Sequence, residues 1–282
     1  MPELPEVEIT ARRLSRALTG VPVESVLAPG MVTMKTFDPP LEALVGTSIS
    51  GVRRVGKMLV VEFGELAVLV HLMSAGRMQL FSERASLRDR RSRLLVRTAD
   101  GRELRLREFG TQQRAWAKLV RAEAVDAEEE VATLGPEAWP APPLEEFSAI
   151  VEQQRHLHPL LRDQRSIAGI GRSWVDEILW TAFESPFRTG ADMATGEVER
   201  LHGAVDQVLG DALAHYEQVV GDSLPDKAPM PLKVHNRHGE ACPRCGATLE
   251  AIFYKDRVTT YCPAEQTGGR VLKDRRLSRL LR

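Results

Sequence analysis

Pro2 and Glu3 carry the functional groups for a nucleophilic reaction at a sugar carbon. Inside a chain the proline nitrogen is an inert tertiary amide, but removal of Met1 would make Pro2 the first residue, with a free secondary amine. Because α-amino groups titrate near neutrality, a useful fraction of this amine would be unprotonated, able to attack C1' and form an iminium ion. The neighbouring Glu3 would supply the carboxyl group that protonates the ring oxygen and moves protons.

The same segment is also typical of a helix start. A proline near the first turn followed by acidic residues suits the positive end of a helix dipole. Apolar residues then recur at helical spacing, with arginines between them, up to Gly20. We therefore expect an amphipathic helix over Pro5 to Leu18, and both interpretations of the N-terminus can hold at once.

Length, charge and cysteine content limit the class of protein. With 282 residues and 43% hydrophobic residues, the chain has room for two domains and a small third module. It has no apolar run of membrane-spanning length and no secretion signal, so we expect no membrane association and an intracellular, cytoplasmic and nucleoid-associated protein. Three cysteines do not form a disulfide framework, and their spacing indicates metal chemistry instead.

The net charge of -1 hides an uneven distribution. Residues 121–149 contain one arginine against eight acidic residues, whereas residues 233–282 contain eleven Lys or Arg against five acidic residues. The first stretch is typical of a solvated connector between domains. The second is typical of a surface that binds an anion.

The N-terminal half is expected to be an antiparallel β-structure. Short segments rich in Val and Leu are separated by turn signals, and they cover Val21–Leu27, Met58–Phe63, Leu66–Leu72, Ser92–Thr98 and Arg102–Arg107. After a proline-rich linker, helical periodicity follows over Leu144–Arg155, Pro159–Gln164, Trp174–Phe183 and Thr195–Val220. The last fifty residues return to loops and a hairpin framed by the cysteines.

Three motifs together resemble the formamidopyrimidine-DNA glycosylase / endonuclease VIII family of base-excision repair enzymes. They are the N-terminal Pro-Glu-Leu-Pro-Glu-Val-Glu, the segment Ile167-Ala168-Gly169-Ile170-Gly171, and the cysteine hairpin. The resemblance implies a bifunctional DNA glycosylase and AP lyase that excises oxidised bases through an N-terminal proline Schiff base and β,δ-elimination. Pro2 would then be the nucleophile, Glu3 the proton donor and Glu6 a supporting carboxylate. The implied partner is double-stranded DNA with damaged bases or abasic sites, and we expect a monomer.

The resemblance also implies phosphate contacts from Lys57 and His71. Lys57 precedes a strand and follows a glycine, which allows close approach of a backbone. From the residues alone, a surface lysine is usually only solvated. A histidine in an apolar strand is more often structural.

Glycosylases take the target nucleotide out of the stack, and protein side chains fill the space left behind. The resemblance assigns this role to Arg107 and Phe109, with Phe109 between the bases and Arg107 pairing with the orphaned base. A methionine usually completes the set in the family. The corresponding position here is Ser74, next to Met73.

Gly169, Gly171 and Arg172 lie between two predicted helices and resemble the family's helix-two-turns-helix element. Glycines at this spacing allow a tight turn that directs backbone N–H groups and a helix N-terminus at a phosphate. Arg172 stands where the family usually has asparagine, which keeps phosphate affinity but changes the hydrogen-bond geometry. Glu177 is expected to be a structural partner.

Cys242, Cys245 and Cys262 match three of the four zinc-ligand positions in the family's zinc-ribbon hairpin, and Glu265 lies near the fourth position. We expect a structural zinc ion on these four residues. A metal-free hairpin is the alternative, and His235 and His238 are weaker candidates for the fourth ligand. The resemblance assigns a phosphate contact to Arg257 in the same hairpin.

The expected fold class is α+β with several domains. A catalytic helix and antiparallel β-sandwich would cover residues 1–125, a linker 126–143, a helix-two-turns-helix DNA-binding domain 144–232, a zinc-finger-like hairpin 233–268 and a basic tail 269–282. The leucines of the tail leave two interpretations open, a DNA contact or a helix docked on the protein. Two rivals to the enzyme remain: a lesion- or abasic-site-binding protein of the same fold, and a zinc-ribbon module unrelated to DNA.

Overall fold

The structure is a computed structural model that describes residues 2–30, 32–86, 89–222, 224–226, 228–254 and 257–272, without the side chains of Tyr254 and Arg257. The chain divides into two compact units. The first contains residues 1–134 and 213–229, and the second contains residues 135–212 and 230–282.

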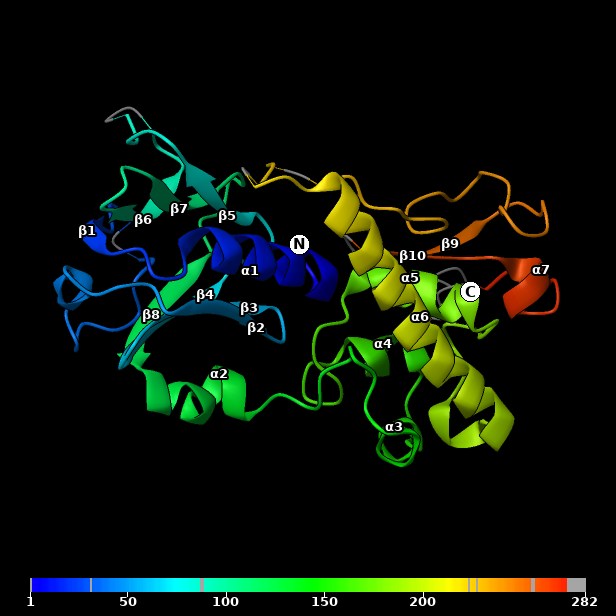
Figure 1. Ribbon diagram of the computed structural model, residues 1–282. Coiled ribbons are helices and arrows are strands. Elements are labelled where there is room, and N and C mark those ends of the chain that lie inside the picture. Colours follow the sequence, from blue (N-terminus) through cyan, green and yellow to red (C-terminus); the bar gives the residue numbers. More distant parts are fainter. Residues whose placement is uncertain are drawn as a thin grey trace. The chain divides into compact units, whose positions relative to one another are not determined.

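The first unit is built from one long helix and two antiparallel sheets. Helix α1 (Leu4–Leu18) starts one residue before the predicted position and buries the apolar face that its periodicity predicts. Figure 1 shows the two sheets as separate layers, and α1 packs on β2 and β3 of one of them. This arrangement confirms the predicted combination of a helix with antiparallel sheets.

The first sheet has the order β1-β6-β7-β5, and the second has the order β2-β3-β4-β8. The strands of the first sheet are β1 (Val23–Leu27), β5 (Gly76–Phe81), β6 (Ser92–Thr98) and β7 (Glu103–Glu108). Those of the second are β2 (Gly51–Val55), β3 (Met58–Phe63), β4 (Leu66–His71) and β8 (Trp116–Arg121). A short 3₁₀ helix, η1 (Leu41–Leu44), lies between β1 and β2.

Three of these strands were not predicted, namely β2, β5 and β8. Each carries charged or amide side chains that obscure the alternation of apolar and polar residues. Their partners come from elsewhere in the chain: Arg54 in β2 pairs with Glu8 of α1, and Lys118 in β8 pairs with Glu128 and Glu130. Local sequence contains no record of these partners, so the strands could not be recognised from it.

Part of the segment that the sequence predicts as a linker is folded. It forms η2 (Ala122–Ala127) and α2 (Glu129–Ala132), and Val125, Val131 and Leu134 pack against a core cluster of β3 and β4 that includes Met58 and Leu69. The acidic side chains face outward or pair with Lys118, while Val125 is buried and Val131 and Leu134 are partly buried. The boundary between the units therefore follows Leu134.

The second unit begins with α3 (Leu144–Val151), α4 (Leu157–Arg162) and α5 (Arg172–Thr181), and a 3₁₀ turn, η3 (Gly190–Asp192), precedes α6. All four helices predicted over residues 144–220 are confirmed. Helix α6 (Thr195–Val219) contributes to both units, because the division falls between Ala212 and Leu213.

A hairpin and a short helix complete the second unit. Strands β9 (Glu250–Tyr254) and β10 (Arg257–Tyr261) pair antiparallel, and α7 (Pro263–Gln266) follows. Trp180, Val234, Cys242, Leu249 and Cys262 form the buried cluster beneath the hairpin. Among the described residues, no helix combines the length and the apolar character that a bilayer span requires.

Candidate active site

The N-terminus of α1 holds Pro2 and Glu3 in a buried position, with the Glu3 residue only 2% exposed. Glu3 is the N-cap of the helix, and its backbone N–H donates to Glu6 Oε2 at 2.8 Å, while the Glu3 side chain accepts from the backbone N–H of Glu6. This reciprocal pair is a capping box. It fixes the peptide that joins Pro2 to Glu3, so the two candidate catalytic residues are held by the helix that they begin.

The second carboxylate oxygen of Glu6 accepts a hydrogen bond from a residue that sequence reasoning missed. Tyr216, in the last turns of α6, donates its hydroxyl to Glu6 Oε1 at 2.7 Å. The Tyr216 residue is fully buried. Burial raises the pKa of its phenol, and the negative charges of Glu6 and Glu3 raise that pKa further, so Tyr216 stays protonated and acts as a donor.

Lys57 and His71 lie at the same end of the second sheet. Lys57 follows Gly56 in the β2–β3 turn, and the next residue, Met58, is the cross-strand partner of His71. Gly56 adopts a φ of 55°, which a side chain at Cβ would oppose. The turn is attached to α1 because Arg54 donates to the Gly56 carbonyl at 3.0 Å and to Glu8 at 2.9 Å.

His71 has a defined tautomer. Its Nδ1 accepts a hydrogen bond from the backbone N–H of Met73 at 2.9 Å, which places the ring proton of the neutral form on Nε2. Burial lowers the pKa of His71 to about 4, and the positive charge of Lys57 contributes to the shift. The imidazole is thus neutral at physiological pH, and it can offer a phosphate a hydrogen bond but no charge.

The resemblance assigns two loops, at Ser74 and at Phe109, to the space that a flipped nucleotide leaves in the DNA. These two loops lie side by side. Phe109 donates its backbone N–H to the Ala75 carbonyl at 3.1 Å, and Gly76 is the cross-strand partner of Glu108. Ser74 is exposed at the loop tip, and Met73 next to it has a φ of 51°. Segments more than thirty residues apart in sequence are therefore brought together by the β5–β7 pairing.

Arg107 is engaged within the first unit. Its guanidinium donates to Gln79 Oε1 at 3.1 Å and lies 3.6 Å from carboxylate oxygens of both Asp89 and Asp226. It also lies 5.1 Å from the ring centroid of Phe109. To pair with an orphaned base, Arg107 would have to exchange these protein partners for the base.

The turn between α4 and α5 contains Gly169 and Gly171. Gly169 has a φ of 104°, a conformation that favours glycine, and its N–H donates to Gln164 Oε1 at 3.0 Å. Gln164 in turn donates to the Ile170 carbonyl at 2.9 Å, so one amide side chain holds both sides of the turn. Gly171 is the N-cap of α5 and Arg172 its first residue, which places both at the positive end of the helix.

Glu177 is a structural partner, as predicted. Its carboxylate accepts the backbone N–H groups of Lys233, Val234 and His235 at 2.8–2.9 Å, and its burial raises the pKa of the carboxyl group. The neighbouring Asp176 accepts from His235 Nδ1 at 2.7 Å. These bonds attach α5 to the segment that leads into the cysteine hairpin.

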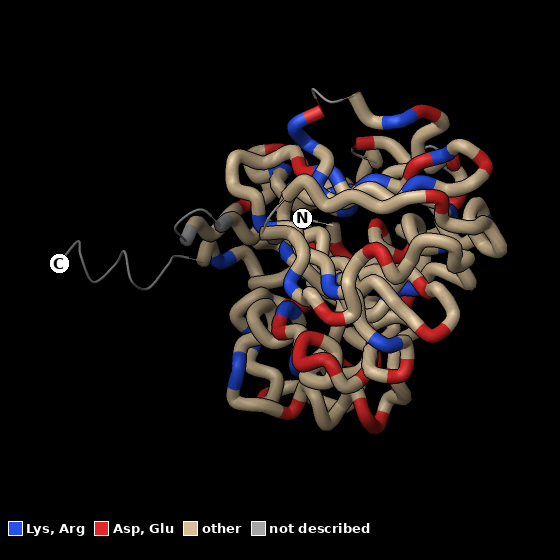
Figure 2. The backbone as a smooth tube through the Cα atoms, turned by 90° about the vertical axis from the view of Figure 1, so that its left-hand side faces the viewer, with Lys and Arg blue, Asp and Glu red and all other residues tan. Residues whose placement is uncertain are grey.

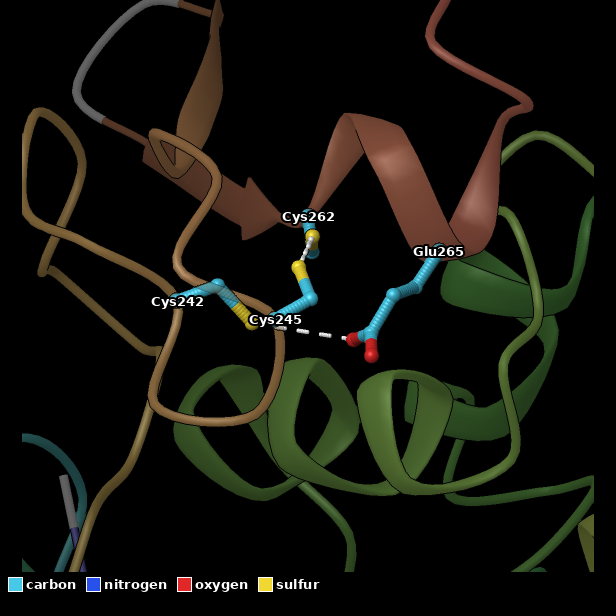
Figure 3. A group of neighbouring side chains, drawn as sticks. All are labelled: Cys242, Cys245, Cys262 and Glu265. Atoms are coloured by element: carbon cyan, nitrogen blue, oxygen red, sulfur yellow. Dashed lines mark hydrogen bonds between the residues drawn. The ribbon is translucent and has the colours of Figure 1, made fainter.

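Figure 3 shows Cys242, Cys245, Cys262 and Glu265 converging on one point, from the loop before β9, the end of β10 and α7. One potential ligand atom from each residue lies within 4.8 Å of the others, with Cys245 Sγ 3.5 Å from Cys262 Sγ and Cys242 Sγ 3.6 Å from Glu265 Oε2. His235 is bonded to Asp176 instead, and in the described part of the chain neither it nor His238 joins this group.

Arg244 fixes the carboxylate of this group. Its Nε donates to Glu265 Oε1 at 2.8 Å, and the resulting hydrogen bond and charge lower the pKa of Glu265. The guanidinium carbon lies 4.1 Å from the ring centroid of Trp180 and 3.8 Å from that of Phe183. The second oxygen of Glu265 remains directed at Cys242 (Figure 3).

Two predicted DNA contacts lie partly or wholly outside the described residues. Arg257 begins β10, but its side chain is not described. The basic tail beyond Leu272 lies outside the described range. Figure 2 shows that basic and acidic positions are otherwise interspersed along the backbone.

Comparisons with known proteins identify the family of the chain. The model of the formamidopyrimidine-DNA glycosylase N-terminal domain matches residues 1–112, and that of the formamidopyrimidine-DNA glycosylase H2TH domain matches residues 134–223. A formamidopyrimidine-DNA glycosylase of Streptococcus thermophilus is 30% identical over 279 residues, covering 93% of this chain and 98% of the relative. One from Latilactobacillus sakei is 29% identical, covering 93% and 97%.

Solved structures give the same result. The Lactococcus lactis Fpg bound to DNA with an abasic site has a TM-score of 0.84 and 26% identity, covering 94% of this chain and 99% of that one. A structure of MutM in complex with DNA containing carbocyclic 8-oxo-G has a TM-score of 0.83 and 27% identity, covering 94% and 100%. With both family domains matched in order and a relative aligned along nearly its whole length, the chain belongs to the formamidopyrimidine-DNA glycosylase family.

Proposed function

We propose that the protein is a bifunctional DNA glycosylase and AP lyase that excises oxidised bases from double-stranded DNA. The observation that carries the proposal is the N-terminal arrangement, in which Pro2 and Glu3 are buried together and their peptide N–H is bonded to Glu6. A proline amine has no use in a protein that only binds DNA. The structural relatives are complexes with abasic-site or damaged-base DNA, which supports the assigned partner.

The proposed reaction uses the groups at the start of α1. With Met1 removed, the Pro2 amine attacks C1' of a flipped nucleotide and displaces the base, which leaves with the amine proton. Glu3 then protonates the ring oxygen as the C1'–O4' bond breaks and the sugar ring opens. The resulting iminium ion acidifies the C2' proton, whose loss expels the 3' phosphate. A second elimination expels the 5' phosphate, and water then hydrolyses the Schiff base and restores the amine.

The proposed DNA contacts divide by role. Lys57, His71, Arg257 and the Gly169–Arg172 turn would bind phosphates, since they offer cations, a neutral N–H donor and a helix N-terminus. Phe109 and Arg107 would occupy the space left by the flipped nucleotide. The proximity of Phe109 to the loop at Ser74 supports this assignment.

Borohydride trapping tests the catalytic proposal. The full-length protein is incubated with duplexes that contain an abasic site, an oxidised purine or an oxidised pyrimidine, and the iminium is reduced to a stable adduct. We expect an adduct that maps to Pro2 by peptide mass spectrometry, and a strong reduction in Pro2→Gly. Tight lesion binding without an adduct would instead support the alternative, a lesion-binding protein of the same fold.

We also propose that Cys242, Cys245, Cys262 and Glu265 bind a structural zinc ion. Zinc bonds of about 2.3 Å to sulfur and 2.0–2.2 Å to oxygen place tetrahedral ligand atoms roughly 3.5–4 Å apart. The separations of 3.5 Å between Cys245 and Cys262 and 3.6 Å between Cys242 and Glu265 fall in this range, and all four ligand atoms lie within 4.8 Å of one another. When bound, zinc would tie the loop before β9 to β10 and α7.

Elemental analysis tests the zinc proposal. We expect about one zinc ion per chain, loss of that zinc in Glu265→Ala, and retention in Glu265→Cys, because a thiolate is a better zinc ligand than a carboxylate. A chelator should lower the Tm of the wild type. Protein purified without chelator that contains no zinc, and whose Tm a chelator leaves unchanged, would establish the metal-free hairpin instead.

A further inference from the structure

The last turns of α6 are clamped onto α1 within the first unit. Arg13, which is 5% exposed, donates to the Val220 carbonyl at 3.0 Å and to the Glu217 carbonyl at 2.8 Å. It also forms an ion pair of 2.8 Å with the Glu217 carboxylate. Because the last carbonyls of a helix have no partner within the helix and carry negative partial charge, this guanidinium both satisfies and stabilises the end of α6.

This clamp determines where the side chain of Tyr216 lies. Tyr216 precedes Glu217 on α6, and its ring is fully buried. A buried hydroxyl requires a partner, and the one that Tyr216 finds is the carboxylate of Glu6. The bond joins residues 210 positions apart in sequence.

The two oxygens of Glu6 have separate functions. Oε1 accepts the Tyr216 hydroxyl at 2.7 Å, and Oε2 accepts the Glu3 N–H at 2.8 Å. That N–H belongs to the peptide bond between Pro2 and Glu3. The carboxylate therefore connects α6 to the peptide plane on which the Pro2 ring is mounted.

We propose that Tyr216 is a positioning residue for the reaction at Pro2, acting through the Glu6 carboxylate to hold the Pro2–Glu3 peptide. This inference rests on the proposed function. Without the Tyr216 hydroxyl, the Glu6 carboxylate would keep its hydrogen bond from the Glu3 N–H but would lose the hydrogen bond that connects it to α6. The Pro2 amine and the Glu3 carboxyl would then sample more orientations, and fewer of them would lead to attack on C1'.

The raised pKa of the Tyr216 phenol is consistent with this role, because the group remains a donor throughout the working pH range. Tyr216 itself does not exchange protons with the substrate. Its effect should therefore fall on the rate of the chemical step and leave DNA affinity unchanged.

Single-turnover kinetics of Tyr216→Phe test the proposal. The substitution removes one hydroxyl and keeps the ring that fills the core. We expect the rate of borohydride-trappable adduct formation at a preformed abasic site to fall by about tenfold to a hundredfold, with an unchanged Kd for the same duplex. Tyr261→Phe is the matched control, because it also removes one hydroxyl hydrogen bond, at 2.7 Å to the Leu272 N–H, from a fully buried tyrosine. It should keep the wild-type rate.

A double-mutant cycle identifies the route of the effect. If Tyr216 acts through Glu6, the combined Tyr216→Phe and Glu6→Ala variant should lose little more rate than Glu6→Ala alone. A wild-type rate for Tyr216→Phe, or fully additive losses in the double variant, would overturn the inference. If Tyr216→Phe does not fold, Glu6→Ala alone must lower the rate of adduct formation by about tenfold to a hundredfold, with an unchanged Kd for the same duplex. Absence of an adduct in the wild type would refute the proposed function, a result that is distinct from these outcomes.

Discussion

At the scale of single residues, the candidate site depends on groups whose protonation is controlled by their surroundings. His71 is kept neutral by burial and by Lys57, and Tyr216 is kept protonated by burial and by Glu6. Glu3 is held in a capping box, so its position is tied to the first turn of α1. Each of these states depends on a neighbour that is distant in sequence or on the fold itself.

Glu3→Gln should separate the two proposed activities. The amide keeps the size of the side chain and can still accept in the capping box, but it cannot deliver a proton to the sugar. We expect base removal to fall by at least about a hundredfold and cleavage at a preformed abasic site to fall much less. Both rates are measured on matched duplexes, and an equal loss in both would contradict the assigned role of Glu3.

The stability of the protein should depend on pH through His71. Its folded pKa of about 4 lies below the unfolded value of 6.5, so between these values the unfolded state binds a proton that the folded state does not. The free energy of unfolding should thus decrease as pH falls from 6.5 to 4, by about 2–3 kcal/mol at most. Urea denaturation at a series of pH values measures the free energy of unfolding and its dependence on pH.

His71→Asn provides the test of the assignment. Its amide oxygen can replace Nδ1 as acceptor for the Met73 N–H, while the side chain no longer titrates. The variant should lose the part of the pH dependence that His71 contributes, whereas His156→Asn, at an exposed position, should keep it. A wild-type slope in His71→Asn would rule out His71 as its source.

At the scale of elements, turns and caps bring the candidate residues to their places. The β2–β3 turn presents Lys57, the β5–β7 pairing joins the loop at Ser74 to Phe109, and the α4–α5 turn presents the N-terminus of α5. Each turn is fixed by side chains that bond to its backbone, such as Gln164 around Gly169.

Gly169→Ala should weaken both the turn and DNA binding. With a φ of 104°, an alanine at this position is strained by about 1–3 kcal/mol, and relaxation would move the N–H groups that are proposed to face a phosphate. We expect a lower Tm and weaker binding to abasic DNA. Gly203→Ala, in the exposed interior of α6 with no atom within 4 Å of the added Cβ, should stabilise the protein by about 0.5–1 kcal/mol and leave binding unchanged. Unaltered DNA affinity in Gly169→Ala would contradict the assigned role of the turn.

At the scale of the whole molecule, DNA affinity must come from the placement of basic groups, because the net charge is only -1. Arginines in the described units are largely paired with carboxylates, as Arg54 is with Glu8 and Arg107 is with Asp89 and Asp226. A few positioned cations and helix termini should therefore account for the electrostatic part of binding.

The salt dependence of DNA binding measures this contribution. Each phosphate contact by a lysine contributes about 0.9 to the slope of log K against log salt concentration. Lys57→Ala should reduce the magnitude of the slope by about 1 and weaken binding to all sequences alike. Lys35→Ala, at an exposed lysine of the same unit, should leave the slope unchanged. An unchanged slope in Lys57→Ala would show that this side chain does not contact phosphate.

The sequence by itself determined the features whose signals are local. The helix after Pro2, the hairpin strands with apolar alternation and the glycine turn before α5 could be predicted, because neighbouring residues establish each of them. The set Cys242, Cys245, Cys262 and Glu265 could be predicted from its resemblance to the family's zinc-ribbon hairpin. Only the tertiary structure decided which distant groups complete them. Some side-chain pairs form only because the elements pack together, namely Tyr216 with Glu6, Arg54 with Glu8 and Arg244 with Glu265. Strands such as β2 and β8 could not be predicted for the same reason. Polar groups in a fold are satisfied by whichever partner packing brings within reach, and no short sequence window contains that information.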